Sequence, residues 1–436
     1  METGREYELL HEEAAGRIAG FVDAASFIEL SPLAMAGVAT GYGTIDSRLV
    51  YIYCQYGAIN TRHADKVAYI YSLAAKMGAP VIALLNSPGA ELSSGVELMS
   101  AYGKVFAGMA SLRGVAPQVS VVLGGCLGMA SMIPMLSDFV IMLRSHASLA
   151  LQSPAAIQDP SAKDITLEEI AGGEHHFKAT GIAHILADDE ANAAASLKSL
   201  ISFLPANNLD EPQPYAQYDD INRTCPDIAC GTYICDIIRA VADNNNLLEL
   251  GQAYTEQVTG FARFNGYTAG IVAFDRPISL GGAQKATYFM SLCDAYNIPI
   301  VTLSTSSGYD YTIANHGNML KAASSLLSTY ASADTPKVSL ICGESYGASA
   351  VTYSKHGGAD ICYAWEGAGI ALMNPENSAK VLGFAMDGSP EESEKMGFID
   401  NVIEPRNTRK MIISALEMLA SKRVVKNTKK HSSRAR

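Results

Sequence analysis

The sequence lacks the patterns that mark several common classes of protein. Its eight cysteines form no C-x-x-C pair, and the trio Cys225, Cys230 and Cys235 has no fourth ligand nearby, so we expect no metal site. The most apolar run, around 119–143, is interrupted by glycine, serine, proline and aspartate, which favours buried core over a membrane span. No P-loop is present, and the polar first residues do not resemble a signal peptide. We therefore expect a cytoplasmic protein with reduced cysteines.

Basic charge is also scarce outside one end of the chain. The 436 residues include 32 lysines and arginines against 44 acids, and seven of the 32 lie in 421–436, where there is no acid. This balance argues against nucleic-acid binding by the body of the protein, and we expect the basic end to be a solvated tail. The length predicts two domains.

What the chain does contain is a tandem repeat. Pro117-Gln-Val-Ser120 recurs as Pro336-Lys-Val-Ser339, which is 219 residues later. The same spacing relates Gly41 to Gly260, Lys66 to Lys285, Pro80 to Pro299, Gly89 to Gly308, Gly124 to Gly343 and Gly128 to Gly347. The proline-rich segment 203–226 is the best linker, so we predict domains at 1–206 and 207–436, each of α/β type. In the first copy we expect a hairpin turning at 45–48, helices over 63–77 and 94–112, and a buried strand over 80–85.

Each copy also places a glycine-rich turn between a buried strand and a helix. In the first copy, strand 119–123 runs through turn 124–128 into an apolar segment, 129–136, that reads as the start of a buried helix. Amides at a helix start have no acceptor within the helix and favour negative charge. Two such turns predict two oxyanion holes, formed by the amides of Gly128 and Met129 and by those of Gly347 and Ala348. The alternative is that the glycines only allow close strand–helix packing.

Other readings of these residues remain open. Residues 343–347 match the G-x-S-x-G elbow of serine hydrolases, which would make Ser345 a nucleophile. Against this, the first copy has Cys126 at that place, and few histidines follow Ser345. Several further residues are expected to have structural roles: Cys126 as a small buried thiol, His175 and His176 in a connector, and Lys66 and Lys285 on equivalent helix faces.

Nearly the whole sequence resembles one family, the carboxyltransferase subunits of biotin-dependent acyl-CoA carboxylases and decarboxylases. This group includes the propionyl-CoA carboxylase β and methylmalonyl-CoA decarboxylase α subunits. The stretches that carry the resemblance are GCLGMASMIPMLSDFVIM (125–142), TLEEIAGGEHHFKATGIAH (166–184), VTGFARFNGYTAGIVA (258–273), CDAYNIPIVTL (293–303) and GFIDNVIEPRNTRKMIISALEML (397–419).

The resemblance implies a fold and a site. The fold would be a tandem duplication of two crotonase-like (ClpP/crotonase) domains, with acyl-CoA on the first and carboxybiotin on the second. Gly128 and Met129 would hold the acyl-CoA enolate, and Gly347 and Ala348 the ureido oxyanion of biotin. The neighbouring turns align with the family's binding motifs, which implies cofactor-binding roles for Pro88, Gly89, Ala90, Gly308 and Tyr309.

The resemblance also implies partners. Biotin would come on a separate carboxyl carrier protein, since this sequence has no evident biotinyl-lysine segment. Further partners would be a biotin carboxylase or a membrane decarboxylase subunit, and a homo-oligomer, a dimer of trimers, whose sites combine halves of different chains. The alternative from another class is a non-catalytic scaffold subunit. It is motivated by Glu91, where the family has arginine, and by a shortened loop after Gln55.

Overall fold

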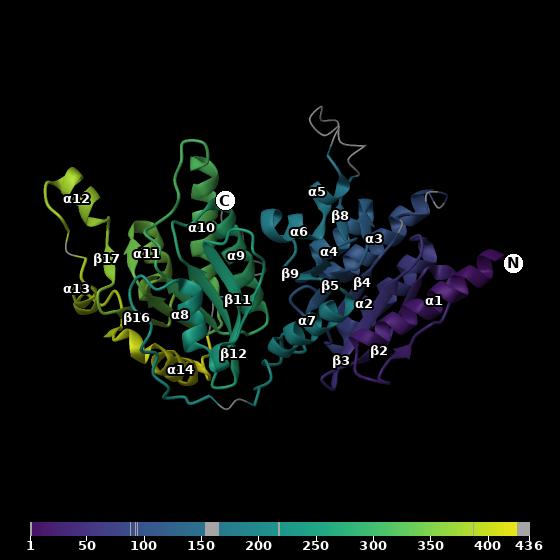
Figure 1. The fold of residues 1–436 in the computed structure, drawn as a ribbon, viewed down its shortest axis with the longest axis horizontal. Helices are drawn as coiled ribbons and strands as arrows, with labels where there is room; N and C mark the ends of the chain where they lie inside the picture. The colour runs from purple at the N-terminus through teal and green to yellow at the C-terminus, as the bar shows by residue number, and fades with distance from the viewer. Residues whose placement is uncertain are drawn as a thin grey trace. The chain divides into compact units, whose positions relative to one another are not determined.

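A computed structural model describes residues 2–87, 89–91, 93, 95–152, 165–216, 219–386 and 388–424 (Figure 1). The chain divides into two compact units. The first comprises Met1–Glu211 with Gly251–Ala253, and the second comprises Pro212–Leu250 and Tyr254–Arg436. The domain boundary predicted after residue 206 lies in the same irregular segment as the observed division, between α7 (Glu190–Phe203) and α8 (Ile234–Val241).

The first unit is a seven-stranded sheet covered by helices. The strands run in the order β1-β2-β3-β4-β5-β7-β9, with β1 to β3 antiparallel and β3 to β9 parallel. Short strands β6 and β8 form a separate parallel pair. The elements besides α7 are α1 (Glu2–Phe21), β1 (Ile28–Glu29), η1 (Ala34–Ala36), β2 (Val38–Ile45), β3 (Arg48–Gln55), α2 (Thr61–Met77), β4 (Val81–Leu85), α3 (Gly95–Leu112), β5 (Gln118–Val122), β6 (Gly125–Leu127), η3 (Gly128–Ser131), α4 (Met132–Leu136), β7 (Phe139–Leu143), β8 (Ser148–Ala150), α5 (Leu167–Ala171), α6 (Gly173–His175), η6 (His176–Thr180) and β9 (Ile185–Ala187).

The second unit repeats this architecture. Its sheet has the order β10-β11-β12-β13-β14-β16-β18, and β15 pairs with β17 as β6 does with β8. The elements besides α8 are η7 (Asp243–Asn245), β10 (Leu247–Glu249), β11 (Gln257–Phe264), β12 (Tyr267–Phe274), α9 (Leu280–Ala295), β13 (Ile300–Ser304), α10 (His316–Ser332), β14 (Lys337–Ile341), β15 (Glu344–Tyr346), α11 (Gly347–Tyr353), η8 (Lys355–Gly357), β16 (Ile361–Trp365), β17 (Gly369–Ala371), α12 (Pro375–Leu382), α13 (Pro390–Lys395), β18 (Asn401–Ile403), η9 (Pro405–Asn407) and α14 (Thr408–Leu419). The identical strand order confirms the tandem duplication.

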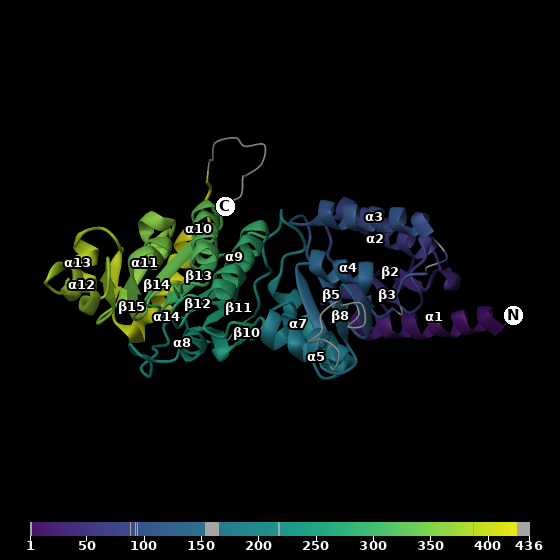
Figure 2. The same cartoon turned by 90° about the horizontal axis from the view of Figure 1, so that it is seen from above.

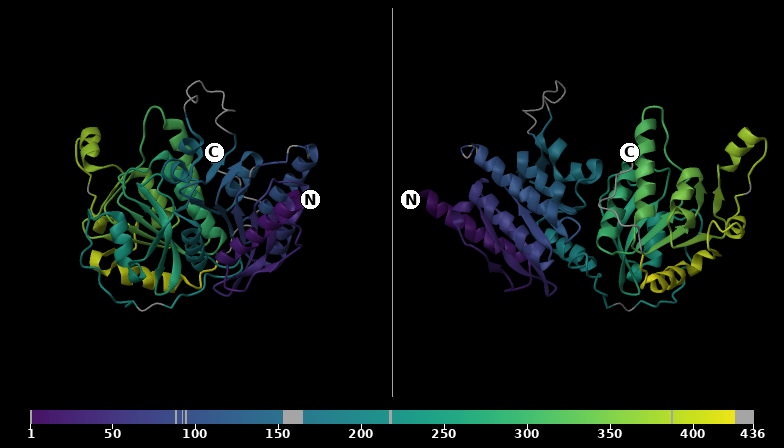
Figure 3. Two further views of the ribbon diagram at one scale, coloured as in Figure 1. Left: turned by 45° about the vertical axis from the view of Figure 1, so that its right-hand side comes forward. Right: turned by 180° about the vertical axis from the view of Figure 1, so that it is seen from behind.

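Helices cover both faces of each sheet. Figure 2 shows α2 and α3 on one side of the first sheet and α1 and α7 on the other, and α9 and α10 opposite α8 and α14 around the second. The central strands β4, β5, β13 and β14 are buried at every position, as expected of parallel strands that lie between two helical layers. The segment with α12 and α13 extends away from the sheet of the second unit (Figure 3). No helix of the described residues is both long and apolar enough to cross a membrane.

Equivalent side chains make equivalent contacts in the two units. The Lys66 ammonium donates to the carbonyl of Val38 at 2.8 Å, and that of Lys285 donates to the carbonyl of Gln257 at 3.0 Å. Both donors and both acceptors keep the 219-residue spacing. The prediction that the two lysines share a structural role on their helices is therefore confirmed.

The second and third strands of each sheet form a hairpin whose turn is held by an aspartate. The predicted turn at 45–48 is confirmed, with positive φ at Asp46 and Ser47, and Asn265 and Gly266 form the equivalent turn. The Asp23 carboxylate accepts from the amides of Asp46 at 3.1 Å and Ser47 at 2.8 Å. In the second unit the Asp243 carboxylate accepts from the amides of Asn265 at 3.1 Å and Gly266 at 2.7 Å.

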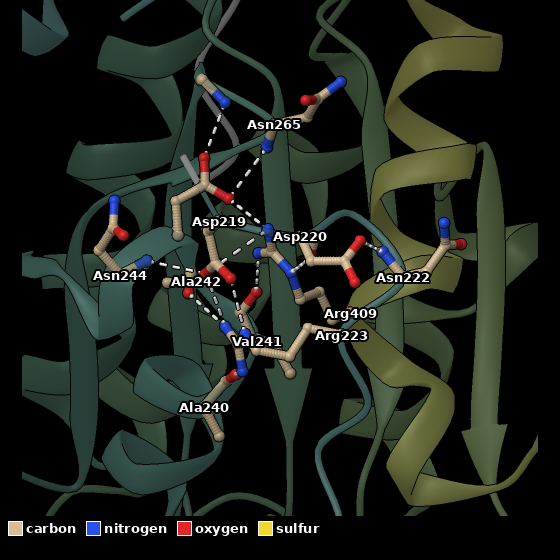
Figure 4. A network of polar contacts seen from close by, with 12 residues as sticks. Asp219, Asp220, Asn222, Arg223, Ala240, Val241, Ala242, Asn244, Asn265 and Arg409 are labelled. Atoms are coloured by element: carbon tan, nitrogen blue, oxygen red, sulfur yellow. Dashed lines mark hydrogen bonds and ion pairs between the residues drawn. The ribbon is translucent and has the colours of Figure 1, made fainter. Parts of the chain in front are cut away.

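The second hairpin is tied to a fully buried arginine (Figure 4). The guanidinium of Arg409, on α14, is fully buried and donates to Asp243 at 2.7 Å and to the carbonyl of Val241 at 2.8 Å. It also lies 3.6 Å from Asp219. Hydrogen bonds from Arg223 come first among the causes that lower the pKa of Asp219 to about 2. This network joins α8, the hairpin and α14 beneath the sheet.

The remaining local predictions have mixed outcomes. Helices α2 and α3 and strand β4 confirm the elements predicted over 63–77, 94–112 and 80–85. The prediction of a buried helix start over 129–136 is wrong in part. Met129, Met132 and Met135 are 37%, 40% and 50% exposed, because Ala130, Ile133 and Pro134 occupy the inner face of this segment.

Candidate functional site

In each unit a helix begins directly after the segment predicted as a glycine-rich turn, and most of that segment forms a short strand, β6 in the first unit and β15 in the second. Gly128 opens η3 with φ of 66°, and Gly347 opens α11 with φ of 60°. The preceding residues, Leu127 and Tyr346, are extended and make no side-chain cap. The first amides of a helix have no acceptor within it. The sequence therefore leaves two donors at each start, the amides of Gly128 and Met129 and those of Gly347 and Ala348.

The environment of the glycines separates a packing role from a conformational one. A Cβ on Gly124 would lie 2.2 Å from Oδ1 of Asn86, so this glycine is needed for close packing. A Cβ on Gly128 would have no heavy atom within 4 Å. Gly128 is therefore required by its positive φ, and not by packing. The packing alternative holds for Gly124 and fails for Gly128.

The helix starts lie at the surface of their units. Met129 and Ala348 are exposed, whereas the residues that follow, Ala130 and Ser349, are each 1% exposed. The Ser349 hydroxyl donates to the carbonyl of Tyr346 at 2.9 Å, which fixes the first turn of α11. Each helix thus starts at an exposed residue, and two backbone donors at such a place are the arrangement that can stabilise a developing oxyanion.

A second glycine turn stands beside each helix start. In the first unit the amide of Ser87 donates to the carbonyl of Gly125 at 3.0 Å, which places the turn that contains Gly89 and Ala90 next to the start of β6. Gly89 has φ of 112°, and its carbonyl accepts from the amide of Ile59 at 2.9 Å. Pro88 lies outside the described residues.

The equivalent turn of the second unit has the same backbone pattern. Gly308 has φ of 141°, and its carbonyl accepts from the amide of Ile278 at 2.8 Å. The Tyr309 hydroxyl lies 3.4 Å from the hydroxyl of Thr352, on α11. Within the second unit, Gly308 and Tyr309 are therefore brought to the helix that begins with Gly347 and Ala348.

An acidic residue follows each glycine turn. The sequence analysis noted the one in the first copy, Glu91, and missed the one in the second. The amide of Glu91 donates to the carbonyl of Ile59 at 2.9 Å, and that of Asp310 donates to the carbonyl of Ile278 at 3.0 Å. Both side chains are exposed, and the Glu91 carboxylate accepts from Ser93 at 3.2 Å. The 219-residue spacing between Glu91 and Asp310 was the available signal.

The structure does not support Ser345 as a nucleophile. Ser345 lies in β15 and is 1% exposed, whereas an elbow serine must reach its substrate. Among the described residues, no recorded hydrogen bond joins it to a histidine, and His356 is exposed on η8.

Cys126 and His176 have the structural character expected of them. Cys126 is buried, and its burial raises the pKa of the thiol to about 12, which keeps it neutral. The two ring nitrogens of His176 contact the Leu149 carbonyl at 2.7 Å and the Thr180 hydroxyl at 2.9 Å. In the parts of the chain that the structure describes, no three potential ligands gather as a metal site.

Comparison with known proteins identifies the fold and the family of this chain. Two α/β units of equal topology, each with an amide pair after a glycine turn, define a protein of tandem crotonase-like domains. The model of the carboxyl transferase domain matches residues 14–394, and the chain belongs to this family. The resemblance seen in the sequence is thereby confirmed.

Relatives align over most of their length. The chain is 34% identical to methylmalonyl-CoA decarboxylase subunit alpha of Veillonella parvula, over 96% of this chain and 92% of that protein. It is 32% identical to the mitochondrial propionyl-CoA carboxylase beta chain of Mus musculus, over 91% and 79%. A crystal structure of transcarboxylase 12S, described as a hexamer assembly with hydrolysed methylmalonyl-coenzyme A bound, superposes with a TM-score of 0.92 at 30% identity, over 99% of this chain and 95% of that one.

Proposed function

We propose that this chain is the carboxyltransferase subunit of a biotin-dependent acyl-CoA carboxylase or decarboxylase, and that it moves a carboxyl group between biotin and a short acyl-CoA. The observation that carries the proposal is the pair of matched helix starts, one per unit, at the exposed residues Met129 and Ala348. Family membership and the named activities of the relatives support the same reaction.

The first unit takes the acyl-CoA in this proposal. The amides of Gly128 and Met129 hold the thioester oxygen as it becomes negative, and the Gly89–Ala90 turn, with Pro88 before it, borders the substrate. Preorganised donors of this kind are worth about 3–4 kcal/mol each in the transition state. The exposed Glu91 does not favour a phosphate beside this turn, so affinity for the CoA phosphates rests on other residues.

The second unit takes biotin, whose ureido group supplies the transferable carboxyl. The amides of Gly347 and Ala348 donate to the ureido oxygen of biotin as negative charge develops on it. The residues at this place suit a biotin ring. A Cβ on Gly308 would have no heavy atom within 4 Å, so space is open at the turn beside α11. Gly308 and Tyr309 border the ring and orient it. The protein thus acts by positioning and electrostatics, without a side-chain nucleophile.

The proposal includes partners and location. Biotin is carried by a separate carboxyl carrier protein, and the complex contains a biotin carboxylase or a membrane decarboxylase subunit. We propose a homohexamer, a dimer of trimers, supported by the hexamer assembly described for transcarboxylase 12S. The cysteines of the described residues are all free, which supports a reducing compartment such as the cytoplasm.

The test is carboxyl transfer between free or carrier-bound biotin and a panel of short acyl-CoAs with the purified chain. We expect transfer with at least one short acyl-CoA, and we expect Ser345→Ala to retain it. A Ser345→Ala variant that loses an esterase activity of the wild type would instead favour a hydrolase. Absence of acyl-CoA binding by calorimetry at millimolar concentration would refute the enzyme and favour the scaffold alternative that Glu91 motivates.

A further inference from the structure

A chain of hydroxyl groups in the second unit joins the Gly308 turn to the start of α11. The Tyr309 hydroxyl lies 3.4 Å from Thr352 Oγ1, and Thr352 Oγ1 donates to the carbonyl of Ala348 at 3.0 Å. A threonine hydroxyl has one proton, which is committed to Ala348. Tyr309 is therefore the donor to Thr352, and the contact runs from the turn to the residue that supplies an amide of the second hole.

The tyrosine is held in place by its neighbours. Tyr353, the neighbour of Thr352 on α11, packs against Phe274 with ring centroids 4.7 Å apart. The Tyr309 ring meets that of Tyr311 edge-on at 6.4 Å. Burial raises the pKa of Tyr309, so its hydroxyl stays protonated and available as a donor.

The first unit has no such link and is tied differently. The residues at the 219-residue spacing are Ala90 and Ile133, which have no hydroxyl. There the amide of Ser87 donates to the Gly125 carbonyl at 3.0 Å and connects the two turns through the backbone. In the second unit the corresponding amide, that of Ser306, donates instead to the side chain of Ser304 at 3.2 Å.

We propose that Tyr309 and Thr352 are a positioning pair that fixes the first turn of α11, and with it the Gly347–Ala348 amides, relative to the Gly308 turn. The pair replaces the backbone link that the first unit has. An oxyanion hole is effective only when its donors are held within about half an ångström of the productive geometry. The hydroxyl of Tyr309 is therefore a specific requirement of the biotin side, beyond the contact that its ring makes.

The direct test needs no activity. Tyr309→Phe removes the donor and keeps the ring, and Thr352→Val removes the acceptor and keeps the shape. We expect faster hydrogen–deuterium exchange of the amides in 347–353 in both variants, and no further increase when they are combined, because both break the same link. Tyr311→Phe, on the same turn, is the matched control and should exchange as the wild type does. Unchanged exchange at 347–353 in both variants would overturn the proposal, as would an equal change in Tyr311→Phe.

The catalytic test rests on the proposed function. With a wild type that transfers carboxyl groups, Tyr309→Phe and Thr352→Val should each lower kcat about tenfold, with the KM for acyl-CoA unchanged. A purely structural role would lower the melting temperature and leave the kcat of the folded fraction intact, and that result would contradict the positioning role. A wild type without transfer activity would refute the proposed function, while the exchange experiment would still decide on the pair.

Discussion

The two hairpin aspartates offer a comparison within one chain, since the same substitution can be made at both turns. Asp243→Asn removes the charge that faces Arg409, whose side chain is fully buried. An amide oxygen at the position of Oδ1 can still accept from the Asn265 amide and from the Arg409 guanidinium, but without the negative charge. The amide nitrogen at the position of Oδ2 cannot accept from the Gly266 amide. Asp23→Asn makes the same change at a partly exposed carboxylate, whose charge is met among the described residues by Lys198 and not by a buried arginine.

The expected costs follow from these surroundings. Removal of one partner of a buried ion pair costs about 3–5 kcal/mol. Asp219, 3.6 Å from Arg409, retains part of the attraction, so we expect the lower end, about 3 kcal/mol. At Asp23, loss of one charge-assisted hydrogen bond should cost about 1 kcal/mol. For units of this size, 1 kcal/mol shifts the melting temperature by about 2–4 °C. The second unit should thus melt about 6–12 °C lower in Asp243→Asn, and the first about 2–4 °C lower in Asp23→Asn.

Hydrogen–deuterium exchange read by mass spectrometry during a thermal or urea series resolves the two units, because each peptide belongs to one of them. Calorimetry on the same samples checks the shifts. The reasoning is refuted when the two substitutions cost the same, or when Asp243→Asn costs under 1 kcal/mol. Either result would mean that Arg409 does not depend on Asp243 for its charge balance.

Two further predictions concern a partly buried lysine and a buried tyrosine of the second unit. Burial lowers the pKa of Lys285 to about 8 from its ordinary 10.5, so between those values the unfolded chain binds more protons than the folded one, and this group adds stability as the pH rises from 8 toward 10.5. The free energy of unfolding of the wild type minus that of Lys285→Met should therefore increase over this range by up to about 1.4 kcal/mol per pKa unit, and a flat difference would contradict the shift. Tyr353 is 1% exposed, and its hydroxyl has no hydrogen-bond partner among the described residues. Tyr353→Phe should therefore leave the free energy of unfolding in urea unchanged or raise it by about 1 kcal/mol, and a clear loss would contradict this prediction.

Much of the fold could be predicted from the sequence because the repeat supplies each pattern twice. The constant spacing identified the duplication, and the β-branched runs bounded by glycine and proline gave the buried strands correctly. The same spacing paired Gly128 with Gly347, and positive φ at both confirms that the backbone requires glycine there.

Side-chain contacts across the chain were beyond such patterns. The exposure of Met129, Met132 and Met135 was missed because nearly all residues of this segment are apolar. The sequence alone does not show which of them face the core. The contact between Arg409 and Asp243 joins residues far apart in the sequence, and no local periodicity reports it. The link from Tyr309 to Thr352 was missed for the same reason.

Deletion of single backbone donors tests the central claim, that amides and not side chains perform the transfer. Met129→Pro and Ala348→Pro each remove one N–H in the first turn of a helix, where proline is best tolerated. Met129→Gly and Ala348→Gly remove the side chain and keep the amide. The activity measured is carboxyl transfer between biotin and an acyl-CoA. Each proline variant should have a kcat about 100- to 1000-fold lower than that of the wild type. The glycine variants should stay near the wild type. Folded proline variants that keep full activity would contradict the account.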